Sequence, residues 1–251
     1  MQILAPQTVT VAELSATVQQ KGYGMLNASR VAEWVGCPLN ELQALSPSWD
    51  EMPPDNHLKD GGRYRRRLHS SFVFENGALH PVPHRAHWQS LDYNALHGGM
   101  ERWFEPMREA TVASAAWTQL LTAFARTASQ VRGTPHTKWC IEAHQFRIDT
   151  TDGIGRPTPE GAHRDGVDVV AVFLVARHGI KGGETRVFEA DGPNGQRFTL
   201  TEPWSLLLLD DQRVIHETTP IQPLQPSGYR DTLVLTCRAG QFQGEDETRA
   251  G

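Results

Sequence analysis

The stretch Val169-Val-Ala-Val-Phe-Leu-Val-Ala176 is the longest apolar run of the chain, and it favours a buried β-strand. A membrane-spanning helix needs roughly 18 consecutive apolar residues, and no run approaches that length. Further strand-like runs occur at short intervals after Gly133, separated by turn clusters such as Gly182-Gly183 and Asp210-Asp211. The expected strands are Trp139–Ile148, Asp168–Ala176, Glu184–Glu189, Arg197–Leu200, Ser205–Leu209, Arg213–Thr218 and Asp231–Arg238. Many short strands without intervening helices predict a mainly β fold, a sandwich or jelly roll.

The first half of the chain is richer in helix signals. Thr10 and Glu13 form a capping-box pattern ahead of an expected helix at Val11–Lys21, which ends at Gly22. A short strand is expected at Tyr23–Leu26, and a further helical stretch at Arg30–Gly36 continues after Pro38. These helices are expected to cover one face of the β core.

Two more elements are expected before Gly133. Apolar residues at helical spacing predict a long helix over Val112–Arg132. Phe72-Val73-Phe74, the turn pair Asn76-Gly77 and the run from Leu79 predict a β-hairpin.

The whole chain is expected to form a single domain of 251 residues. Residues 1–135 would form a helix-rich cap with a flanking hairpin, residues 136–239 a jelly-roll core with the chemistry, and residues 240–251 a frayed tail.

Composition narrows the functional class. The chain has 24 Lys+Arg against 29 Asp+Glu, a net charge of −5, and so lacks the basic balance typical of nucleic-acid binding. We expect no nucleic-acid and no membrane partner, and the N-terminus carries no secretory signal pattern. Cys37, Cys140 and Cys237 are odd in number and far apart, which favours a reducing cytoplasm over a disulfide framework or a cysteine-zinc site. The oligomeric state is left open.

A metal site is indicated by His163-Arg-Asp165, an H-x-D pattern. In an extended segment residues i and i+2 project to the same side, so one imidazole and one carboxylate can hold the same ion. His216, after the apolar run Leu206–Leu209 and a tight turn, is the best third ligand. Two histidines and one carboxylate leave coordination positions open, as in non-haem Fe(II) oxygenases. Alone, the tripeptide fits a surface hydrogen-bonded pair equally well.

A second feature follows the third ligand. Arg230 comes 14 residues after His216, at the head of an expected strand. An arginine there can hold a dicarboxylate through a bidentate pair, and Thr232 would face the same way. A plain surface charge is the alternative reading of Arg230.

Together these features resemble the bacterial 2-oxoglutarate/Fe(II) dioxygenase family that includes L-isoleucine dioxygenase and related free-amino-acid hydroxylases. The matching pieces cover most of residues 60–238. They include Asp60-Gly-Gly-Arg63-Tyr64-Arg65-Arg66-Arg67, Asp92-Tyr93-Asn94-Ala-Leu-His-Gly98-Gly99, Glu142-Ala-His-Gln145-Phe-Arg147, Pro157-Thr-Pro-Glu-Gly-Ala-His163-Arg-Asp165-Gly-Val-Asp168, Gly182-Gly183-Glu184, Asp210-Asp-Gln-Arg-Val-Ile-His216, Thr219-Pro-Ile221 and Tyr229-Arg230-Asp-Thr-Leu233.

The resemblance implies a double-stranded β-helix (jelly-roll) fold and an enzyme that uses Fe(II), 2-oxoglutarate and O₂, with ascorbate as an activator in vitro. It implies hydroxylation of an unactivated C–H of a small free amino acid, aliphatic or cyclic, with succinate and CO₂ as co-products. Two alternatives stay open: the same chemistry on a carrier-bound or peptidyl residue, and a jelly-roll sensor that binds metal and 2-oxoglutarate without turnover. The substrate, the carbon attacked and the stereochemistry are not fixed.

Further polar residues are candidates for the cavity. Gln145 could hydrogen-bond 2-oxoglutarate, although a satisfied core glutamine is equally expected. Candidates for the substrate are Arg63, Tyr64 and Arg65 for a carboxylate, and Glu160 and Asp168 for an ammonium group.

The remaining histidines have ordinary explanations. His144 is better explained as a buried structural histidine than as a fourth ligand. His80, His84 and His87 have the spacing of a metal cluster, but the prolines between them favour a loop.

Overall fold

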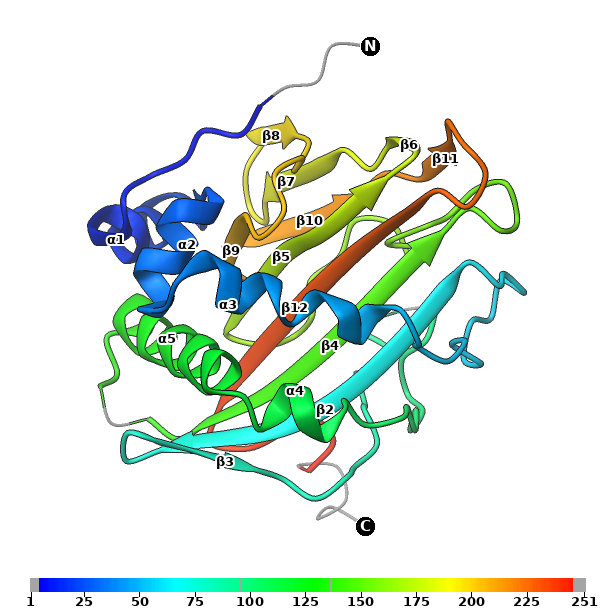
Figure 1. Cartoon of the computed structure of the whole chain (residues 1–251). Coiled ribbons are helices and arrows are strands. Elements are labelled where there is room, and N and C mark those ends of the chain that lie inside the picture. Colours follow the sequence, from blue (N-terminus) through cyan, green and yellow to red (C-terminus); the bar gives the residue numbers. More distant parts are fainter. Residues whose placement is uncertain (1–4, 95, 136, 246–251) are drawn as a thin grey trace.

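A seven-stranded antiparallel sheet forms the framework of the computed structural model, which describes residues 5–94, 96–135 and 137–245. In spatial order its strands are β1 (Tyr23–Leu26), β9 (Leu206–Asp210), β5 (Val169–His178), β12 (Tyr229–Ala239), β4 (Trp139–Asp149), β2 (Arg65–Glu75) and β3 (Ala78–Pro81). Long strands β2, β4 and β12 lie side by side across the middle of the molecule (Figure 1).

Two small sheets lie over one face of this major sheet. One contains β10 (Val214–Thr218), β7 (Thr185–Glu189) and β8 (Gly195–Phe198), and the other pairs β11 (Ile221–Pro223) with β6 (Ile180–Gly182). Both small sheets stand at the top of the view in Figure 1, beside β5 and β9. This antiparallel two-layer arrangement is the jelly-roll core expected from the sequence.

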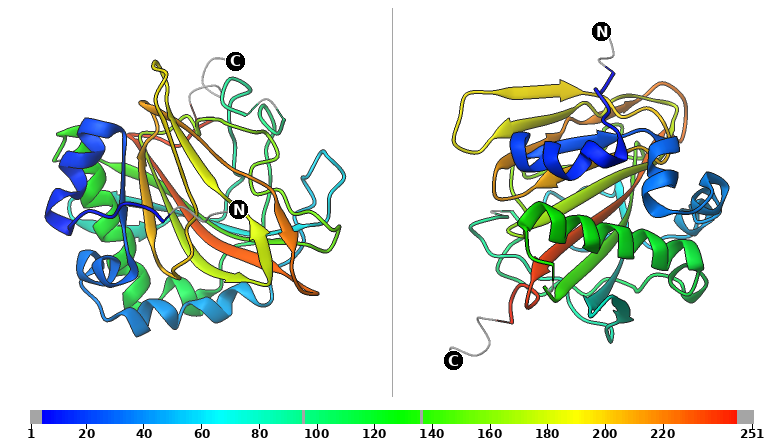
Figure 2. Two further views of the ribbon diagram at one scale, coloured as in Figure 1. Left: turned by 90° about the horizontal axis from the view of Figure 1, so that it is seen from above. Right: turned by 90° about the vertical axis from the view of Figure 1, so that its left-hand side faces the viewer.

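The helices cover the opposite face of the major sheet, as expected (Figure 2). They are α1 (Val11–Lys21), α2 (Ala28–Val35), α3 (Leu39–Gln43), α4 (Glu109–Val112) and α5 (Ala115–Arg132), with a 3-10 turn η1 at Ser46–Trp49. The capping box of Thr10 and Glu13 is formed, and Gly22 ends α1 with a φ of 81°. No helix in the described ranges is long and apolar enough to cross a membrane.

Two apolar cores explain why β5 is a continuous apolar run. Ala171 and Phe173 pack in the core between the sheet and the helices. Val170 and Leu174, which alternate with them, pack against Val187 of β7 in the core between the sheets. Successive side chains of a strand point to opposite faces, so a strand covered on both sides must be apolar at every position.

The structure corrects several element boundaries. Ser114 interrupts the long helix expected from Val112: its side chain accepts a hydrogen bond from the Trp117 amide and so begins α5. The expected hairpin is present, and Asn76 and Gly77 both have positive φ. However, β2 already begins at Arg65, inside the arginine run.

The division expected at residue 135 does not separate a cap from a core. Strands β1 and β2 belong to the major sheet, and residues from both sides of the division line the cavity, such as His87 and Arg102 before it and His163 and Arg230 after it. The tail expected to fray from Gly240 is packed through Glu245, with the Phe242 side chain buried. Residues 246–251 lie outside the described part of the chain.

Candidate active site

A cavity of about 110 Å³ lies between the inner face of the major sheet and the loops above it. Side chains of three neighbouring strands line its floor in rows. On β12 they are Arg230, Thr232, Val234 and Thr236; on β4 they are Ile148, Phe146, His144 and Glu142; and on β2 they include Arg65 and Arg67. The alternation of β-strands therefore selects which residues of these segments reach the cavity.

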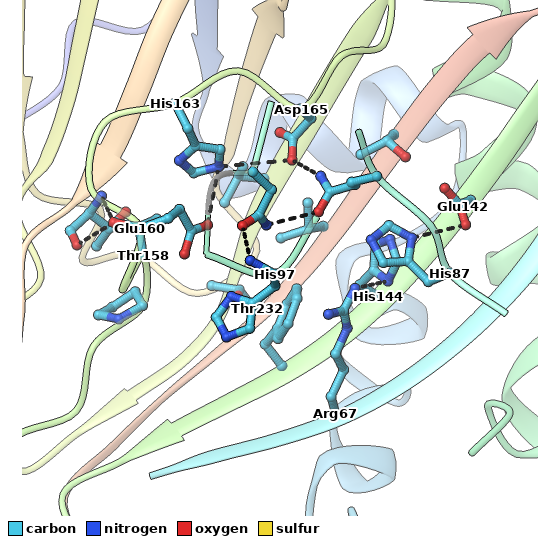
Figure 3. Close-up of a pocket in the computed structure, with 18 of the residues that line it drawn as sticks. Arg67, His87, His97, Glu142, His144, Thr158, Glu160, His163, Asp165 and Thr232 are labelled. Carbon is cyan, nitrogen blue, oxygen red and sulfur yellow. Dashed lines mark hydrogen bonds and ion pairs between the residues drawn. The ribbon is translucent and has the colours of Figure 1, made fainter. Parts of the chain in front are cut away.

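His163, Asp165 and His216 meet on the wall of this cavity. His163, in the loop before β5, is fixed beside His216 on β10 by two backbone hydrogen bonds of 3.1 and 2.9 Å. The His163 Nε2 is 3.9 Å from Asp165 Oδ1, and the His216 Nε2 is 3.8 Å from Asp165 Oδ2. One ligand atom from each residue lies within 4.8 Å of the others. The three side chains predicted from the H-x-D pattern and the distal histidine are thus brought together, and Figure 3 shows His163 and Asp165 side by side.

The hydrogen bonding of these side chains suits a metal. The His163 Nδ1 donates to the carbonyl oxygen of Gly161 at 2.9 Å, which leaves the Nε2 lone pair directed at Asp165. Burial and the neighbouring His163 lower the pKa of His216 to about 3, so this imidazole is neutral. Burial lowers the pKa of His163, but the nearby carboxylates of Asp165 and Glu160 outweigh burial, so that the pKa of His163 is raised overall. A divalent cation would replace the proton that His163 takes up.

The loop that carries Asp165 is held from two sides. The buried carboxylate of Asp211 accepts hydrogen bonds from the backbone amides of Asp165, Gly166 and Val167, at 2.7 to 3.0 Å. From the tail, the Gln243 amide donates to the carbonyl oxygens of Asp165 and Gly166. These contacts fix the backbone of a predicted ligand residue, and the sequence patterns identified neither of them.

Arg230 and Thr232 lie on the floor of the same cavity, as predicted. Arg230 is buried at 4% exposure, and its Nε has no hydrogen-bond partner in the described structure. Burial and the neighbouring Arg177 lower the pKa of Arg230 to about 10. A buried guanidinium without an acceptor costs free energy, so this end of the cavity suits an anion.

Gln145 does not reach the cavity, contrary to the expectation. It alternates with His144 and Phe146 on β4 and therefore points to the helical side, where its Nε2 donates to Ser48 Oγ at 2.6 Å. Gln145 is therefore buried in the core, which agrees with the alternative interpretation as a core glutamine.

The structure separates the five predicted substrate contacts into two groups. Arg65 and Glu160 line the cavity. Arg63 is exposed and pairs with Asp152, the Tyr64 hydroxyl donates to Asp60, and Asp168 pairs with Arg132 outside the cavity. The sequence pattern placed the cations in the right segment but could not decide which side of the strand each would occupy.

Two cavity residues, Gln89 and Arg102, were not identified by the sequence patterns, and two others, Arg67 in the arginine run and His144, were not given a place in the cavity. Arg67 had a signal, because it stands two residues after Arg65 and a strand places both on one side. Gln89 and Arg102 come from the covering loop, which has no periodicity from which their direction could be predicted.

A second group of histidines and a carboxylate lies at the other side of the cavity (Figure 3). His69 Nε2 and His87 Nδ1 both donate to Glu142 Oε1, at 3.0 and 3.1 Å. Arg67 donates to His144 Nδ1 at 3.0 Å. Among the described residues, His80, His84 and His87 form no metal cluster, in line with the loop that the prolines favour: His87 joins this group, whereas His80 is exposed.

His84 lies apart as well, since its Nε2 donates to the Phe104 carbonyl oxygen at 2.7 Å. His144, for which a buried structural position was expected, is buried beside His69, with ring centroids 4.7 Å apart. Its ring nonetheless lines the cavity.

Several solved structures share this fold. A BsmA homologue from Methylobium petroleophilum PM1 is 49% identical over 97% of this chain and 99% of its own, with a TM-score of 0.90. IDO from Bacillus thuringiensis is similar in fold, at 18% identity over 92% of this chain and 100% of its own, with a TM-score of 0.77. The Fe(II)/α-ketoglutarate-dependent dioxygenase TqaL has a TM-score of 0.67 at 16% identity, over 93% of this chain and 88% of its own.

The family model described as 2OG-Fe dioxygenase matches residues 46–236. No curated protein matches the chain. The matched range of the family model covers most of the chain, including β2, β4, β5, β10 and most of β12. The chain therefore belongs to the 2OG-Fe dioxygenase family, and is an enzyme that uses Fe(II), 2-oxoglutarate and O₂.

Proposed function

We propose that this enzyme hydroxylates an unactivated C–H of a small free amino acid, aliphatic or cyclic, and releases succinate and CO₂. The observation that carries the proposal is one cavity that contains the metal triad, a buried Arg230 whose Nε has no partner, and further charged groups on other elements. A dicarboxylic co-substrate and a small charged substrate can both be held there by charge.

In this proposal His163, Asp165 and His216 hold Fe(II). When bound, the iron would supply the activation of O₂, with 2-oxoglutarate as the source of electrons, which no side chain can perform. The two neutral imidazoles and one carboxylate leave positions free on the cavity side for both co-substrates. Asp211 and Gln243 keep the Asp165 loop in place through its backbone.

Arg230 orients 2-oxoglutarate by binding its distal carboxylate. The guanidinium sits at the end of its row on β12, next to Arg177 of β5 across the sheet. Thr232 follows on the same strand and face, and its hydroxyl can donate to the same carboxylate. A co-substrate anchored there extends along the floor toward the triad.

The small free substrate is supported by the polar lining of the cavity, to which Arg65 and Glu160 contribute. A second candidate is the same chemistry on a carrier-bound or peptidyl residue, for which an exposed basic surface would serve as the docking site. It has weaker support, because the exposed arginines of the basic run, Arg63 and Arg66, each lie near an aspartate that offsets their charge. A cytoplasmic location belongs to the proposal and is supported by three free, buried cysteines.

The test is a mass-spectrometric screen for the gain of one oxygen across free L-amino acids, beside their N-acyl and methyl-ester forms. It is run with Fe(II), 2-oxoglutarate and ascorbate, and succinate is measured in parallel. The expected result is one or a few aliphatic or cyclic amino acids oxidised with matching succinate. Oxidation confined to carrier-bound or peptidyl forms would replace this proposal with the second candidate.

A further inference from the structure

Two guanidinium groups in the cavity have no carboxylate partner, and neither takes part in anchoring 2-oxoglutarate as proposed. Arg67 and Arg102 are buried, at 5% and 2% exposure. By contrast, the neighbouring Arg65 is paired with Asp55 at 2.6 Å. Within the described ranges neither Arg67 nor Arg102 lies within ion-pair distance of a carboxylate, and the Nε of each has no hydrogen-bond partner.

The surroundings of Arg67 direct its donors into the cavity. Its guanidinium carbon lies over the rings of Phe104 and Phe146, 4.0 and 4.7 Å from their centroids. A guanidinium held over aromatic rings keeps its in-plane N–H groups for a bidentate partner. One of these groups already donates to His144.

Arg102 is linked to the metal site by a single side chain. Its Nη2 donates to Gln89 Oε1 at 2.8 Å, and the Gln89 amide nitrogen lies 3.3 Å from Asp165 Oδ1. A group bound at Arg102 is thus only one amide side chain away from a proposed iron ligand.

The two cations also act on each other. Burial, and then the charge of Arg102, lower the pKa of Arg67 well below its usual range. Two buried like charges without an anion are unfavourable, so a carboxylate bound between them would relieve their repulsion as well as gain hydrogen bonds.

A complementary group is present beside the iron site. Glu160 lines the cavity with its Oε1 3.5 Å from the His163 Nε2, while its Oε2 is buried and has no donor. The polar atoms left without partners are therefore N–H donors at one place and a carboxylate oxygen at another, and a zwitterion supplies the missing partner of each.

We propose that Arg67 and Arg102 bind the α-carboxylate of the substrate and that Glu160 binds its α-ammonium group. This inference rests on the proposed amino-acid hydroxylation and deepens it, because it requires a substrate with both groups free. The carboxylate of the substrate and the distal carboxylate of 2-oxoglutarate then occupy different sites, on β2 with the covering loop and on β12 respectively. A thioester or peptide-linked substrate would leave both guanidiniums unpaired.

The experiment measures binding without turnover, by anaerobic calorimetry on enzyme loaded with Fe(II) and 2-oxoglutarate. L-isoleucine, L-leucine and L-pipecolate are the probes, each beside its methyl ester and N-acetyl form. With wild-type enzyme, the ester and the N-acetyl form of the best-bound amino acid should each bind at least about 30-fold more weakly, as expected when one partner of a buried charge pair is removed. This arm needs no variant and therefore does not depend on a variant folding.

Variants then test the residues. Arg67→Met keeps the stem beside Phe104 and Phe146 and should raise the Kd of the free amino acid at least about 30-fold, with the Kd of 2-oxoglutarate nearly unchanged. Arg67→Lys, which keeps the charge but loses the fork, should recover part of the affinity. The matched control is Arg66→Gln, one residue away on β2, where the arginine is half-exposed and donates to the Met52 carbonyl oxygen.

The outcomes distinguish a failure of the proposed carboxylate site from a failure of the proposed amino-acid hydroxylation. Ester binding as tight as that of the free amino acid, or an Arg67→Met effect no larger than that of Arg66→Gln, overturns the carboxylate site while oxidation of an amino acid still supports the proposed function. A loss of 2-oxoglutarate binding instead assigns the pair to the co-substrate and also overturns it. If no probe binds and no free amino acid is oxidised in the screen, the proposed function fails and this inference fails with it.

Discussion

Two clusters of histidine and carboxylate face the same cavity, yet their hydrogen bonding differs. In one, His163 is held through Nδ1, and the Nε2 atoms of His163 and His216 lie 3.9 and 3.8 Å from the Asp165 carboxylate oxygens, beyond hydrogen-bond distance. In the other, Glu142 already accepts hydrogen bonds from His69 and His87. The Nε2 atoms of the first cluster are thus available to a cation, whereas Glu142 Oε1 of the second cluster is already occupied by two histidines.

The difference teaches that closeness of ligand-type residues is not enough for a metal site. In the second cluster, the Arg67 guanidinium occupies the Nδ1 of His144 and brings a positive charge against any cation. His69 and His144 are stacked with an interplanar angle of 15°, so their nitrogen lone pairs run side by side instead of converging. We therefore assign iron to the triad and treat the second cluster as a hydrogen-bonded wall of the cavity.

The largest expected effect tests this assignment directly. Asp165→Asn should lower the affinity for Fe(II) by more than about 100-fold, since even residues outside the ligand shell cost about 10- to 100-fold when lost. The measurement is iron content after dialysis, together with succinate release. His87→Gln, the matched change in the second cluster, should retain iron. If His87→Gln lost iron as completely as Asp165→Asn, the comparison between the clusters would be wrong.

The next effect concerns the anchor of the co-substrate. Arg230→Ala should raise the KM for 2-oxoglutarate far more than that for the amino acid. Removing one partner of a desolvated charge pair costs about 2–5 kcal/mol, or about 30- to several-thousand-fold in affinity. Steady-state kinetics with each substrate varied in turn gives both constants. An unchanged KM for 2-oxoglutarate would move the anchor elsewhere, with Arg67 and Arg102 as the first alternative.

A smaller effect is expected at Asp211, which touches no proposed ligand atom directly. Its carboxylate accepts hydrogen bonds from the three backbone amides of residues 165–167. Asp211→Ala should therefore loosen the loop and weaken Fe(II) binding by about 10- to 100-fold. Competitive chelation measures the affinity. Asp191→Ala, in an exposed turn, is the control, and equal iron affinity in both variants would show that the loop does not need this support.

Much of this arrangement could be predicted from the sequence, for reasons specific to each part. The apolar run of β5 predicts a strand covered on both faces, and the H-x-D pattern with His216 and Arg230 predicts which residues would meet at the cavity. Gln145 shows the limit of such predictions. A shift of one residue along a strand moves a side chain from the cavity to the helical core, and the sequence pattern did not fix that position.

Contacts made by loops could not be predicted. Gln89 and Arg102 reach the cavity from a segment without regular structure, and Gln243 reaches it from a tail expected to be frayed. Their positions follow from long-range packing, of which a single sequence carries no periodic signal.

The smallest expected effect is on stability, and it again separates the two clusters. Burial lowers the pKa of His87 to about 3, below the value of about 6.5 expected in an unfolded chain. Below pH 6.5 the unfolded chain therefore takes up a proton that the folded protein does not, and the free energy of unfolding falls as the pH is lowered. From pH 7 to pH 5.5 this one histidine should account for about 1 kcal/mol.

Urea denaturation of wild type and His87→Gln at the two pH values measures this contribution. The variant should lose about 1 kcal/mol less than wild type on acidification, because it lacks a proton-binding group at this position. His80→Gln, at an exposed site on β3, should behave like wild type. Equal pH dependence in wild type and His87→Gln would mean that His87 is protonated in the folded protein. Glu142 would then form a charged pair with it, and the description of His87 as a neutral hydrogen-bond donor in the second cluster would have to be abandoned.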